Sequence, residues 1–422
     1  MPSSPRPHSR LTSNLRIDGE RLWGSLMAMA QIGATTRGGC NRQALTAVDK
    51  EGRDLFVSWC KGAGCAIEID QIGNIFARRP GREPESAPVL IASHLDTQPT
   101  GGRFDGVYGV LAGLEVVRTL NDAGISTRRP IVVASWTNEE GARFAPAMLG
   151  SGVFAGAHDL DYAYSRADRD RVTVQEALAA IGYLGVAPVG GRPFSAAFEV
   201  HIEQGPILEA SGDLIGVVTG VQGCFWFDLV LTGSAAHAGS TPMEMRRDPW
   251  RAALPILETA FAIAEARAPF GRCTIGDLAV EPGSRNTVPE RLKIAIDLRH
   301  PEADILAVMH AELEAEVVRA CAERRIDGKL EEIWRMPPTN FAPALVDEVE
   351  AAAQALGLPS RRMVSGAGHD SLHLASVAPT AMIFVPCADG VSHNEAESAE
   401  PAHLAAGADV LLQTVLAAAD AP

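Results

Sequence analysis

The chain has 422 residues, of which 46% are hydrophobic and 21% charged, close to the average of globular proteins. At about 150 residues per domain, this length predicts two or three domains and excludes a small stapled module. There are 37 Lys and Arg against 52 Asp and Glu, and the net charge of −15 excludes a surface that tracks a nucleic-acid backbone. We therefore expect a folded, acidic protein whose partners include no nucleic acid.

The cysteines and the apolar stretches indicate where the protein works. Its seven cysteines are scattered and form no C-x-x-C pair, which argues against a disulfide framework and favours a reducing cytoplasm. Residues 1–10 are rich in Pro, Ser and Arg and hold no apolar run, so we expect a flexible tail and no signal peptide. No apolar stretch approaches the roughly 18 residues that a membrane span needs, so we expect no membrane partner.

Short apolar runs alternate with helical patterns in the first part of the chain. Residues 89–92 and 131–134 are β-branched runs bounded by turn residues, and a helical pattern over 110–120 separates them. A similar strand lies far downstream at 381–385 and precedes a helical pattern near 402–418. Such alternation predicts an α/β domain with a mixed, parallel-rich sheet, shared by the first and last parts of the chain.

The middle of the chain has a different texture. Residues 225–231 alternate in polarity, helical patterns cover 249–266 and 301–324, and strands are expected at 273–280 and 291–298. The order β-α-β-β-α-β is typical of a ferredoxin-like α+β unit, here inserted into the larger domain. The predicted division is one domain formed by residues 11–214 and 334–422, and an inserted domain formed by residues 215–333.

Polar side chains follow the predicted strands, where α/β sheets collect their functional groups. His94 and Asp96 follow the first strand, so that Asp96 can orient the imidazole ring. Asp105 lies in a glycine-rich turn before a helix, and Glu139 and Glu140 follow the second strand. Each signal alone has an ordinary explanation as a strand end, a helix N-cap or an acidic surface loop.

Two more histidines complete a set of possible metal ligands without cysteine. His201 lies inside an apolar run, and His393 lies in an acidic loop after the last sheet strand. The set comprises His94, Asp105, Glu140, His201 and His393, and it suits two divalent ions such as Zn²⁺, Mn²⁺, Co²⁺ or Ni²⁺. A shared Asp105 would hold the ions together, and of the adjacent Glu139 and Glu140 one can bind a cation while the other faces the attacking water as general base.

Other catalytic patterns are absent from the sequence. It has no G-x-S-x-G, H-E-x-x-H or G-x-x-x-x-G-K-[ST] motif, which disfavours serine, zincin and nucleotide chemistry. Residues 365–371 place Ser, His and Asp close in sequence, but the members of a triad normally converge from separate elements. We interpret this segment as a loop on the substrate side of the site.

Eight segments, taken in order, resemble the amidase/hydantoinase/carbamoylase branch of the carboxypeptidase-G-like, aminoacylase-like metallopeptidases. They are SHLDTQPTGGRFDGVYGVLAG, WTNEEGARFAPAMLGSG, HIEQGP, GSAAHAGSTPM, RNTVPE, DLRHP, SGAGHD and SHNEAE. The resemblance covers nearly the whole chain beyond the first ten or so residues. It implies a catalytic α/β domain with a binuclear metal centre, an inserted lid domain that forms a homodimer, and hydrolysis of a non-peptide C–N bond.

The resemblance also implies roles for individual residues. One ion would be bound by His94, Asp105 and His201, and the other by Asp105, Glu140 and His393. Glu139 would be the general base, with Asp96 orienting His94. The residues implied to contact the substrate are His237 at the developing oxyanion, Gln204 at the ureido group, and Asn286 with Arg299 at the carboxylate.

The implied reaction is hydrolysis of N-carbamoyl-L-amino acids to amino acid, CO₂ and ammonia. Its substrate is a small molecule with a ureido group and a carboxylate. The same metal chemistry leaves 3-ureidopropionase, allantoate amidohydrolase, aminoacylase and dipeptidase activities open. An alternative of a different class is a non-catalytic, metal-stabilised module that binds carboxylates.

Overall fold

The computed structural model describes residues 14–421, so the tail predicted at residues 1–10 lies outside the described residues. The chain forms two compact units: unit 1 runs up to Gly220 and resumes at Asn340, and unit 2 is Val221–Thr339. These divisions lie a few residues beyond the boundaries 215 and 333. The reason is that β6 (Ile215–Val221) and β13 (Thr339–Asn340) belong to the sheet of unit 1.

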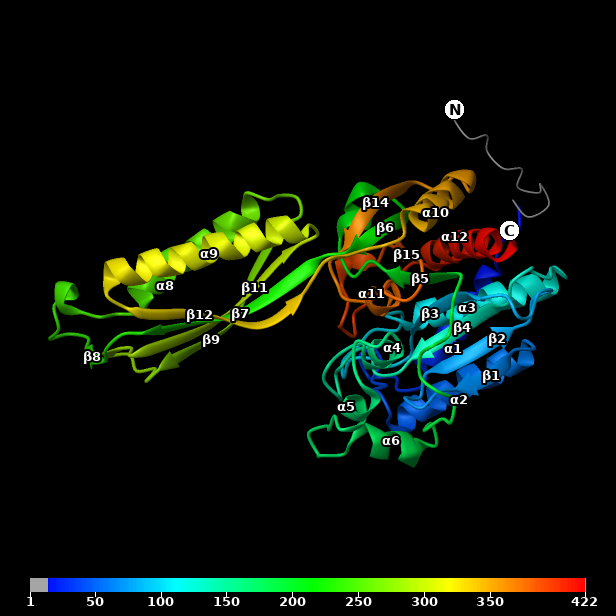
Figure 1. Ribbon diagram of the computed structural model, residues 1–422, viewed down its shortest axis with the longest axis horizontal. Helices are drawn as coiled ribbons and strands as arrows, with labels where there is room; N and C mark the ends of the chain where they lie inside the picture. Colours follow the sequence, from blue (N-terminus) through cyan, green and yellow to red (C-terminus); the bar gives the residue numbers. More distant parts are fainter. Residues whose placement is uncertain (1–13, 422) are drawn as a thin grey trace. The chain divides into compact units, whose positions relative to one another are not determined.

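Among the described residues, unit 1 holds a nine-stranded sheet (Figure 1). The strand order is β1-β2-β4-β3-β5-β15-β6-β13, and β14 pairs with β6. The central strands β4, β3, β5 and β15 run parallel, whereas β1 and β2 on one side and β6 on the other pair antiparallel. The sequence-based expectation of a mixed, parallel-rich sheet is confirmed. The remaining bounds are β1 Ala66–Ile69, β2 Ile75–Arg79, β3 Val89–His94, β4 Ile131–Trp136, β5 Ala196–Ile202, β14 Ser360–Ser365 and β15 Thr380–Val385.

The central strands are buried along their whole length. Every residue of β3 (VLIASH) and β4 (IVVASW) is buried, as expected for parallel strands that lie between helical layers. The helices of unit 1 are α1 Gly19–Ala30, α2 Ala47–Gly62, α3 Val107–Asp122, α4 Leu149–Phe154, α5 Leu160–Tyr164, α6 Val174–Ile181, α7 Ile207–Ser211, α10 Pro343–Ala355, α11 Ser371–Leu374 and α12 Pro401–Asp420, with a 3₁₀ turn η2 at Ala388–Gly390.

The C-terminal helix α12 is the one helix among the described residues that is long and apolar enough to cross a membrane. Of its apolar window, 67% is buried inside the fold, where the helix packs against α3, α10 and β15. Its apolar length therefore has an explanation within unit 1, as the core helix of a sheet layer.

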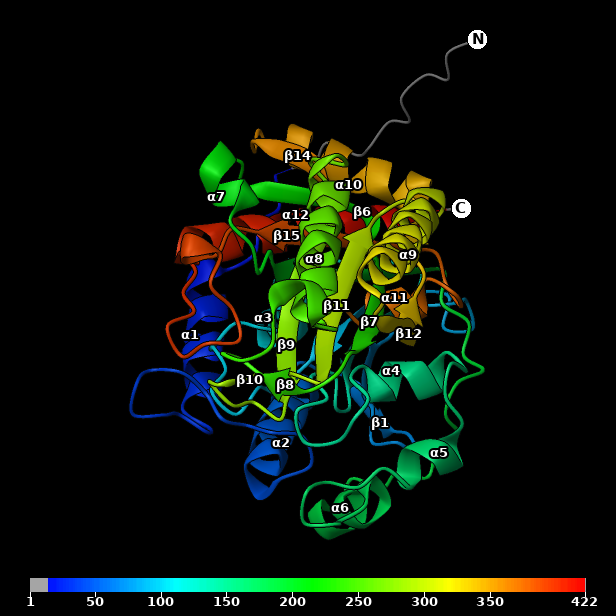
Figure 2. The same ribbon diagram turned by 90° about the vertical axis from the view of Figure 1, so that its left-hand side faces the viewer.

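Unit 2 is a four-stranded antiparallel sheet with two helices on one face. The sheet order is β12-β7-β11-β9, and α8 and α9 lie side by side along it (Figures 1 and 2). The chain order β7-α8-β9-β11-α9-β12 is the predicted β-α-β-β-α-β pattern. The bounds are β7 Gly223–Thr232, β8 Ala236–His237, η1 Met243–Met245, α8 Trp250–Glu265, β9 Arg272–Glu281, β10 Thr287–Val288, β11 Arg291–His300, α9 Ala303–Arg324 and β12 Asp327–Met336.

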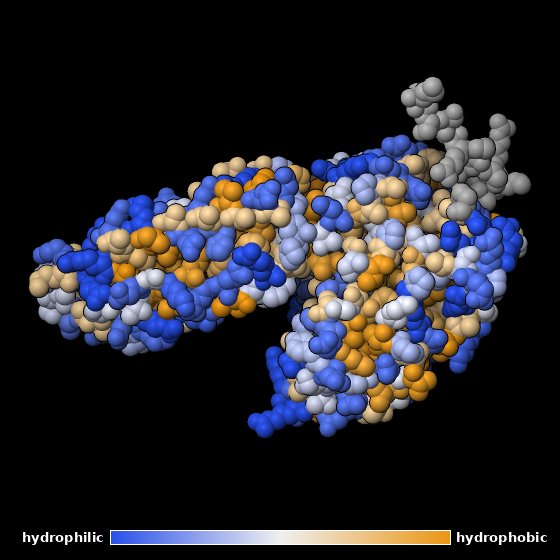
Figure 3. Space-filling model, in the orientation of Figure 1, coloured by the Kyte–Doolittle hydropathy of each residue, from blue (hydrophilic) through white to orange (hydrophobic). Residues whose placement is uncertain are grey.

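Alternation along β7 and β11 explains how unit 2 forms its core. On β7, Phe225, Phe227, Leu229 and Leu231 are buried against α8 and α9, while the residues between them point to the opposite face. On the visible surface of both units, apolar residues lie interspersed with hydrophilic ones (Figure 3).

Candidate metal centre and active site

The candidate site lies in unit 1, at the carboxyl ends of the central parallel strands. His94 is the last residue of β3, His201 lies near the end of β5, and Glu139 and Glu140 follow β4. Asp105 comes from the turn that precedes α3. Because the carboxyl ends of parallel strands share one edge of the sheet, residues far apart in sequence meet there.

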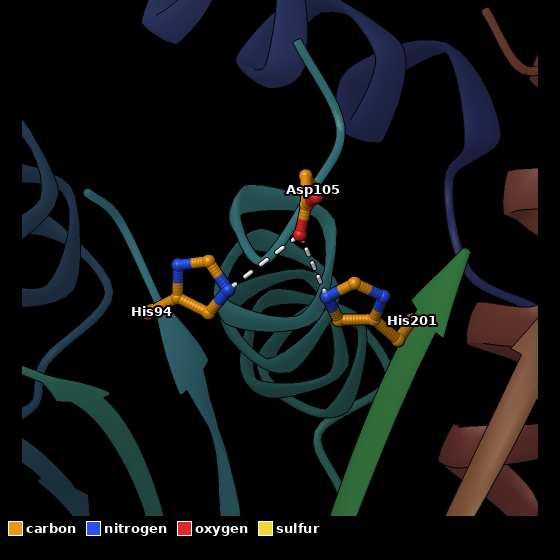
Figure 4. Close-up of side chains that lie close together, drawn as sticks. All are labelled: His94, Asp105 and His201. Atoms are coloured by element: carbon orange, nitrogen blue, oxygen red, sulfur yellow. Dashed lines mark ion pairs between the residues drawn. The ribbon is translucent and has the colours of Figure 1, made fainter. Parts of the chain in front are cut away.

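His94, Asp105 and His201 form the first group of possible ligands. Both imidazole rings point toward the Asp105 carboxylate (Figure 4). His201 Nε2 lies 3.2 Å and His94 Nε2 lies 3.7 Å from Asp105 Oδ1, and all three side chains are buried. Their possible ligand atoms lie within 4.8 Å of one another, close enough to share one ion.

Asp105, Glu140 and His393 form a second such group on the other oxygen of Asp105. His393 Nε2 lies 3.5 Å from Asp105 Oδ2 and 3.3 Å from Glu140 Oε2. The His393 side chain is half exposed, unlike the other ligands. Because the two oxygens of Asp105 face different groups, this carboxylate has the placement of a ligand shared by two ions.

The histidines are prepared to offer neutral Nε2 lone pairs. His94 Nδ1 lies 2.9 Å from the Asp96 carbonyl oxygen, and His201 Nδ1 lies 2.9 Å from the Ile202 carbonyl oxygen. Such contacts place the ring proton on Nδ1, and the Gly106 backbone N–H donates to His201 Nε2 at 3.0 Å. These tautomers and the carboxylate oxygens suit borderline divalent cations.

Gly106 allows the Asp105 turn to approach His94. This glycine has φ 67° and begins α3. A Cβ at this position would lie 2.2 Å from His94 Nε2, so any other residue would push the ring away from Asp105. The glycine therefore serves both the left-handed backbone and the close packing of the site.

The electrostatics of the site favour a positive charge close to its buried carboxylates. Burial lowers the pKa of His94 to about 4, and burial with the nearby Asp49 raises the pKa of Asp96 to about 7. Burial and neighbouring carboxylates hold the pKa values of Glu139 and Glu140 well above the ordinary range. Carboxylates crowded in a buried place are stabilised when cations lie between them.

Asp105 and His201 each shift the pKa of the other in the direction opposite to the effect of burial. Burial alone would raise the pKa of Asp105, but His201, His94 and His393 hold it below its ordinary value. Burial alone would lower the pKa of His201, but the Asp105 carboxylate raises it to about 9. Nε2 of His201 accepts from the Gly106 N–H, as a neutral ring does, and a divalent ion bound by the two side chains would compete with protonation of His201.

Glu139 lies beside both groups without belonging to either. Its Oε2 is 3.4 Å from His94 Nε2, and its side chain is nearly buried. Its backbone N–H donates to Asp96 Oδ1 at 3.3 Å, and that of Glu140 donates to Asp96 Oδ2 at 3.2 Å. The Asp96 carboxylate thus fixes the two-glutamate turn, and its Oδ1 also lies 3.9 Å from His94 Nδ1, while the Asp96 carbonyl oxygen makes the shorter contact with that ring.

Gln204 lies in contact with the shared ligand. Its Nε2 donates to Asp105 Oδ2 at 2.8 Å and to Ser392 Oγ at 3.2 Å. Its Oε1 is buried and has no hydrogen-bond partner among the described residues. The amide therefore has an acceptor available for a donor group at the site.

The other three residues expected at the site belong to unit 2. His237 and Asn286 lie close together where β8 meets β10: His237 Nδ1 accepts from the Gly239 and Ser240 backbone N–H groups, and the Asn286 carbonyl accepts from the Ala238 N–H. Arg299 lies on β11, where Asp297 binds its guanidinium. Unit 1 thus brings together the metal, base and Gln204 positions, and unit 2 carries the remaining three.

Sequence reasoning missed several residues of the site. Glu397 accepts hydrogen bonds from the backbone N–H groups of Phe104 and Asp105, at 2.8 and 3.2 Å. His369 meets His201 edge to face with ring centroids 4.7 Å apart, and Glu199 forms a third possible ligand group with these two rings. Glu397 and His369 lie in the SHNEAE and SGAGHD segments. The ionisable residues in these segments were the sequence signal that could have pointed to them.

The fold and the site together define a metal-dependent hydrolase. The chain belongs to the peptidase family M20/M25/M40, which matches residues 90–417. An N-carbamoyl-L-amino-acid amidohydrolase of Rhizobium meliloti is 51% identical over 407 residues, covering 96% of this chain and 98% of that protein. Another, from Geobacillus stearothermophilus, is 38% identical and covers 94% and 98%. The crystal structure of an amidase of the hydantoinase/carbamoylase family from Burkholderia multivorans has a TM-score of 0.94 and 54% identity, covering 97% and 99%.

Proposed function

We propose that this enzyme hydrolyses the carbamoyl C–N bond of N-carbamoyl-L-amino acids. Water adds its oxygen to the ureido carbonyl carbon, and the bond to the amino-acid nitrogen breaks. That nitrogen takes up a proton and leaves as the free amino acid, and the carbamate decays to CO₂ and ammonia. The observation that carries the proposal is the arrangement around Asp105, whose two oxygens face two ligand groups with Glu139 beside them.

The proposed metal ligands are His94, Asp105 and His201 for one ion, and Asp105, Glu140 and His393 for the other. Two divalent ions, Zn²⁺, Mn²⁺, Co²⁺ or Ni²⁺, would supply Lewis-acid polarisation of the carbonyl and a lower pKa for the attacking water. Glu139 takes the proton of that water and delivers it to the leaving nitrogen. The position of its carboxylate, 3.4 Å from His94 Nε2 and beside both ligand groups, supports this transfer, because a general base must lie within reach of the proton it takes.

The proposed substrate contacts follow the roles that the matching motifs imply. The unpartnered Gln204 Oε1 would accept from an N–H of the ureido group. In unit 2, His237 would donate to the developing oxyanion, and Asn286 with Arg299 would bind the substrate carboxylate. These roles rest on the matching motifs of this chain, and each can be tested by substituting one residue.

We also propose that unit 2 is a lid that forms a homodimer, and that the protein works in the cytoplasm. Exposed apolar side chains on its helices, Leu254 and Phe261 on α8 and Val318 on α9, support a contact surface between copies. All seven cysteines are free, which suits a reducing compartment. Light scattering of wild type and Leu254→Glu tests the dimer: a monomeric wild type contradicts it.

A substrate panel tests the proposed reaction. Ammonia and amine release would be measured with N-carbamoyl-L- and D-amino acids, 3-ureidopropionate, allantoate and N-acetyl-amino acids, with and without added Mn²⁺. We expect the N-carbamoyl-L-amino acids to give the highest kcat/KM. Turnover restricted to allantoate or 3-ureidopropionate would replace the proposal, and ligand binding without turnover would favour a carboxylate-binding module.

Glu139→Gln tests the general base. This substitution keeps the size of the side chain but removes its basicity, so we expect turnover to fall by at least about 10²-fold while metal content stays unchanged. Glu51→Gln, on the exposed face of α2, is the matched control. Retained turnover in Glu139→Gln would refute the assignment of the base.

A further inference from the structure

Unit 2 exposes two tryptophans on the sheet face that α8 and α9 leave uncovered. Trp226 on β7 and Trp334 on β12 are cross-strand partners, with ring centroids 4.8 Å apart. They remain 45% and 41% exposed, although Phe225 and Phe227 on either side of Trp226 are buried in the core under the helices. Because successive strand residues point to opposite faces, the two indoles lie on the open face.

Asp297 connects the first indole to Arg299. Asp297 is the cross-strand partner of Trp226 on β11. Its Oδ2 accepts from Trp226 Nε1 at 3.0 Å and from Arg299 Nη2 at 2.7 Å, and its Oδ1 accepts from Arg299 Nε at 3.0 Å. One carboxylate oxygen thus holds the indole N–H and the guanidinium side by side, and both groups are oriented.

An exposed indole held beside a guanidinium, with a second indole in contact with it on the next strand, matches the chemistry of an amino acid. In an amino acid, the carboxylate and the side chain are attached to the same Cα atom. A carboxylate bound by Arg299 therefore brings the first side-chain atoms close to the guanidinium. A cation attracts the carboxylate, and flat aromatic surfaces favour apolar or aromatic groups. A substrate with a second charged or ureido group would bury that group against the indoles. The group would lose its hydrogen bonds to water without gaining a protein partner for each polar atom.

We infer that the Trp226–Trp334 pair contacts the substrate side chain and makes the enzyme select N-carbamoyl-L-amino acids with aromatic or long apolar side chains. The inference rests on the proposed function, specifically on Arg299 as the carboxylate anchor. Asp297 acts as a positioning residue that sets the indole at a fixed place beside the guanidinium. The same surface disfavours 3-ureidopropionate, which has no side chain, and allantoate, which has a second ureido arm.

The test compares two substrates in each variant. The ratio of kcat/KM for N-carbamoyl-L-phenylalanine to that for N-carbamoyl-L-alanine would be measured in wild type, Trp226→Ala and Trp334→Ala. We expect the ratio to favour phenylalanine in wild type and to fall about 10-fold or more in each variant, a difference typical of lost apolar contacts. Trp334 contacts the Trp226 ring from β12, so Trp334→Ala removes the second indole and keeps the hydrogen bonds of Trp226 and Arg299 to Asp297.

Tyr162→Ala is the matched control, because Tyr162 is an aromatic residue of unit 1 that is 40% exposed. Thermal melting and light scattering of each variant monitor folding and assembly. An unchanged ratio overturns the inference, whether or not the variants change their oligomeric state. An equal loss for both substrates also overturns it, since that result indicates a role in positioning Arg299 alone. If wild type releases ammonia from neither substrate, the proposed function fails and the inference fails with it.

Discussion

Glu397 connects the two loops that supply ligands to both ion positions. It lies in the same loop as His393, and its Oε1 accepts from the backbone N–H groups of Phe104 and Asp105. Its Oε2 accepts from the Ser392 hydroxyl at 3.0 Å, and the Ser392 hydroxyl also lies 2.8 Å from Asp105 Oδ2. We predict that Glu397→Ala loosens Asp105 and His393 together.

The contacts set the magnitude of this effect. Alanine leaves two buried N–H groups without an acceptor, and each such group costs about 1–3 kcal/mol, which predicts a loss of about 2–6 kcal/mol in unfolding free energy. Residues that orient metal ligands typically change metal affinity by about 10–100-fold. Burial raises the pKa of Glu397 to about 7, so glutamine resembles its neutral form and still offers one acceptor oxygen. Glu397→Gln should therefore lose much less than Glu397→Ala.

The assay measures Zn²⁺ affinity by competition with a chromophoric chelator, and unfolding by urea in the metal-free and metal-loaded protein. Glu395→Ala is the control, since Glu395 lies in the same loop but pairs with the exposed Arg37 at 3.5 Å. We expect this control to bind metal as wild type does. Wild-type Zn²⁺ affinity in Glu397→Ala would refute the reasoning, and so would equal losses in Glu395→Ala and Glu397→Ala.

Three further outcomes follow from buried charges. Arg53→Met should lower the unfolding free energy by about 3–5 kcal/mol in urea, because Asp49 loses its buried partner at 2.7 Å; a change below 1 kcal/mol would contradict this. Chelation should lower the melting temperature, and added Mn²⁺ should restore it. At a free Mn²⁺ concentration of 100 times its dissociation constant, binding adds about 2.7 kcal/mol to the unfolding free energy. An unchanged melting temperature would contradict metal binding. Burial raises the pKa of Asp70 from 3.8 to about 7, so its contribution to stability is complete below pH 4 and is lost as the pH rises through 7. Relative to Asp70→Asn, wild type should therefore lose stability between pH 4 and pH 7, and a constant difference would exclude this shift.

The main elements were predictable because their burial leaves a strong pattern. The runs at 89–92 and 131–134 became β3 and β4, and the helical patterns at 249–266 and 301–324 became α8 and α9. The last strand of the predicted β-α-β-β-α-β order received no bounds from the sequence: β12 reads DGKLEEIWRM and is mostly exposed, so its sequence carries little alternation.

The same distinction separates the parts of the candidate site. His94 and Glu140 follow buried strands, and strand ends in a parallel sheet converge whatever the loops do. Glu397 and Ser392 act by hydrogen bonds to a loop almost 300 residues away in sequence. Such contacts depend on how two loops fold onto each other, and no local period in the sequence encodes that. The specific hydrogen bonds of Asp297 on β11 likewise needed the register of β7 and β11.

Backbone conformation adds a physical reason to connect the site with bound cations. Asn138, Gln204 and His393 have φ of 56°, 57° and 52°, in the left-handed region that non-glycine residues seldom adopt. Each of the three lies in a segment that carries a candidate site residue, and such positions cost of order 1–3 kcal/mol unless their surroundings hold them. For Asn138 the surroundings are protein, since its amide donates to the Phe144 carbonyl at 2.7 Å. His393 is half exposed and its ring faces two carboxylates, so a cation between them would hold it there. The conformation at His393 should therefore relax when metal is removed, and increased hydrogen exchange of residues 391–397 on chelation, reversed by metal, would measure it. Exchange that does not change would show that the protein contacts alone hold this loop.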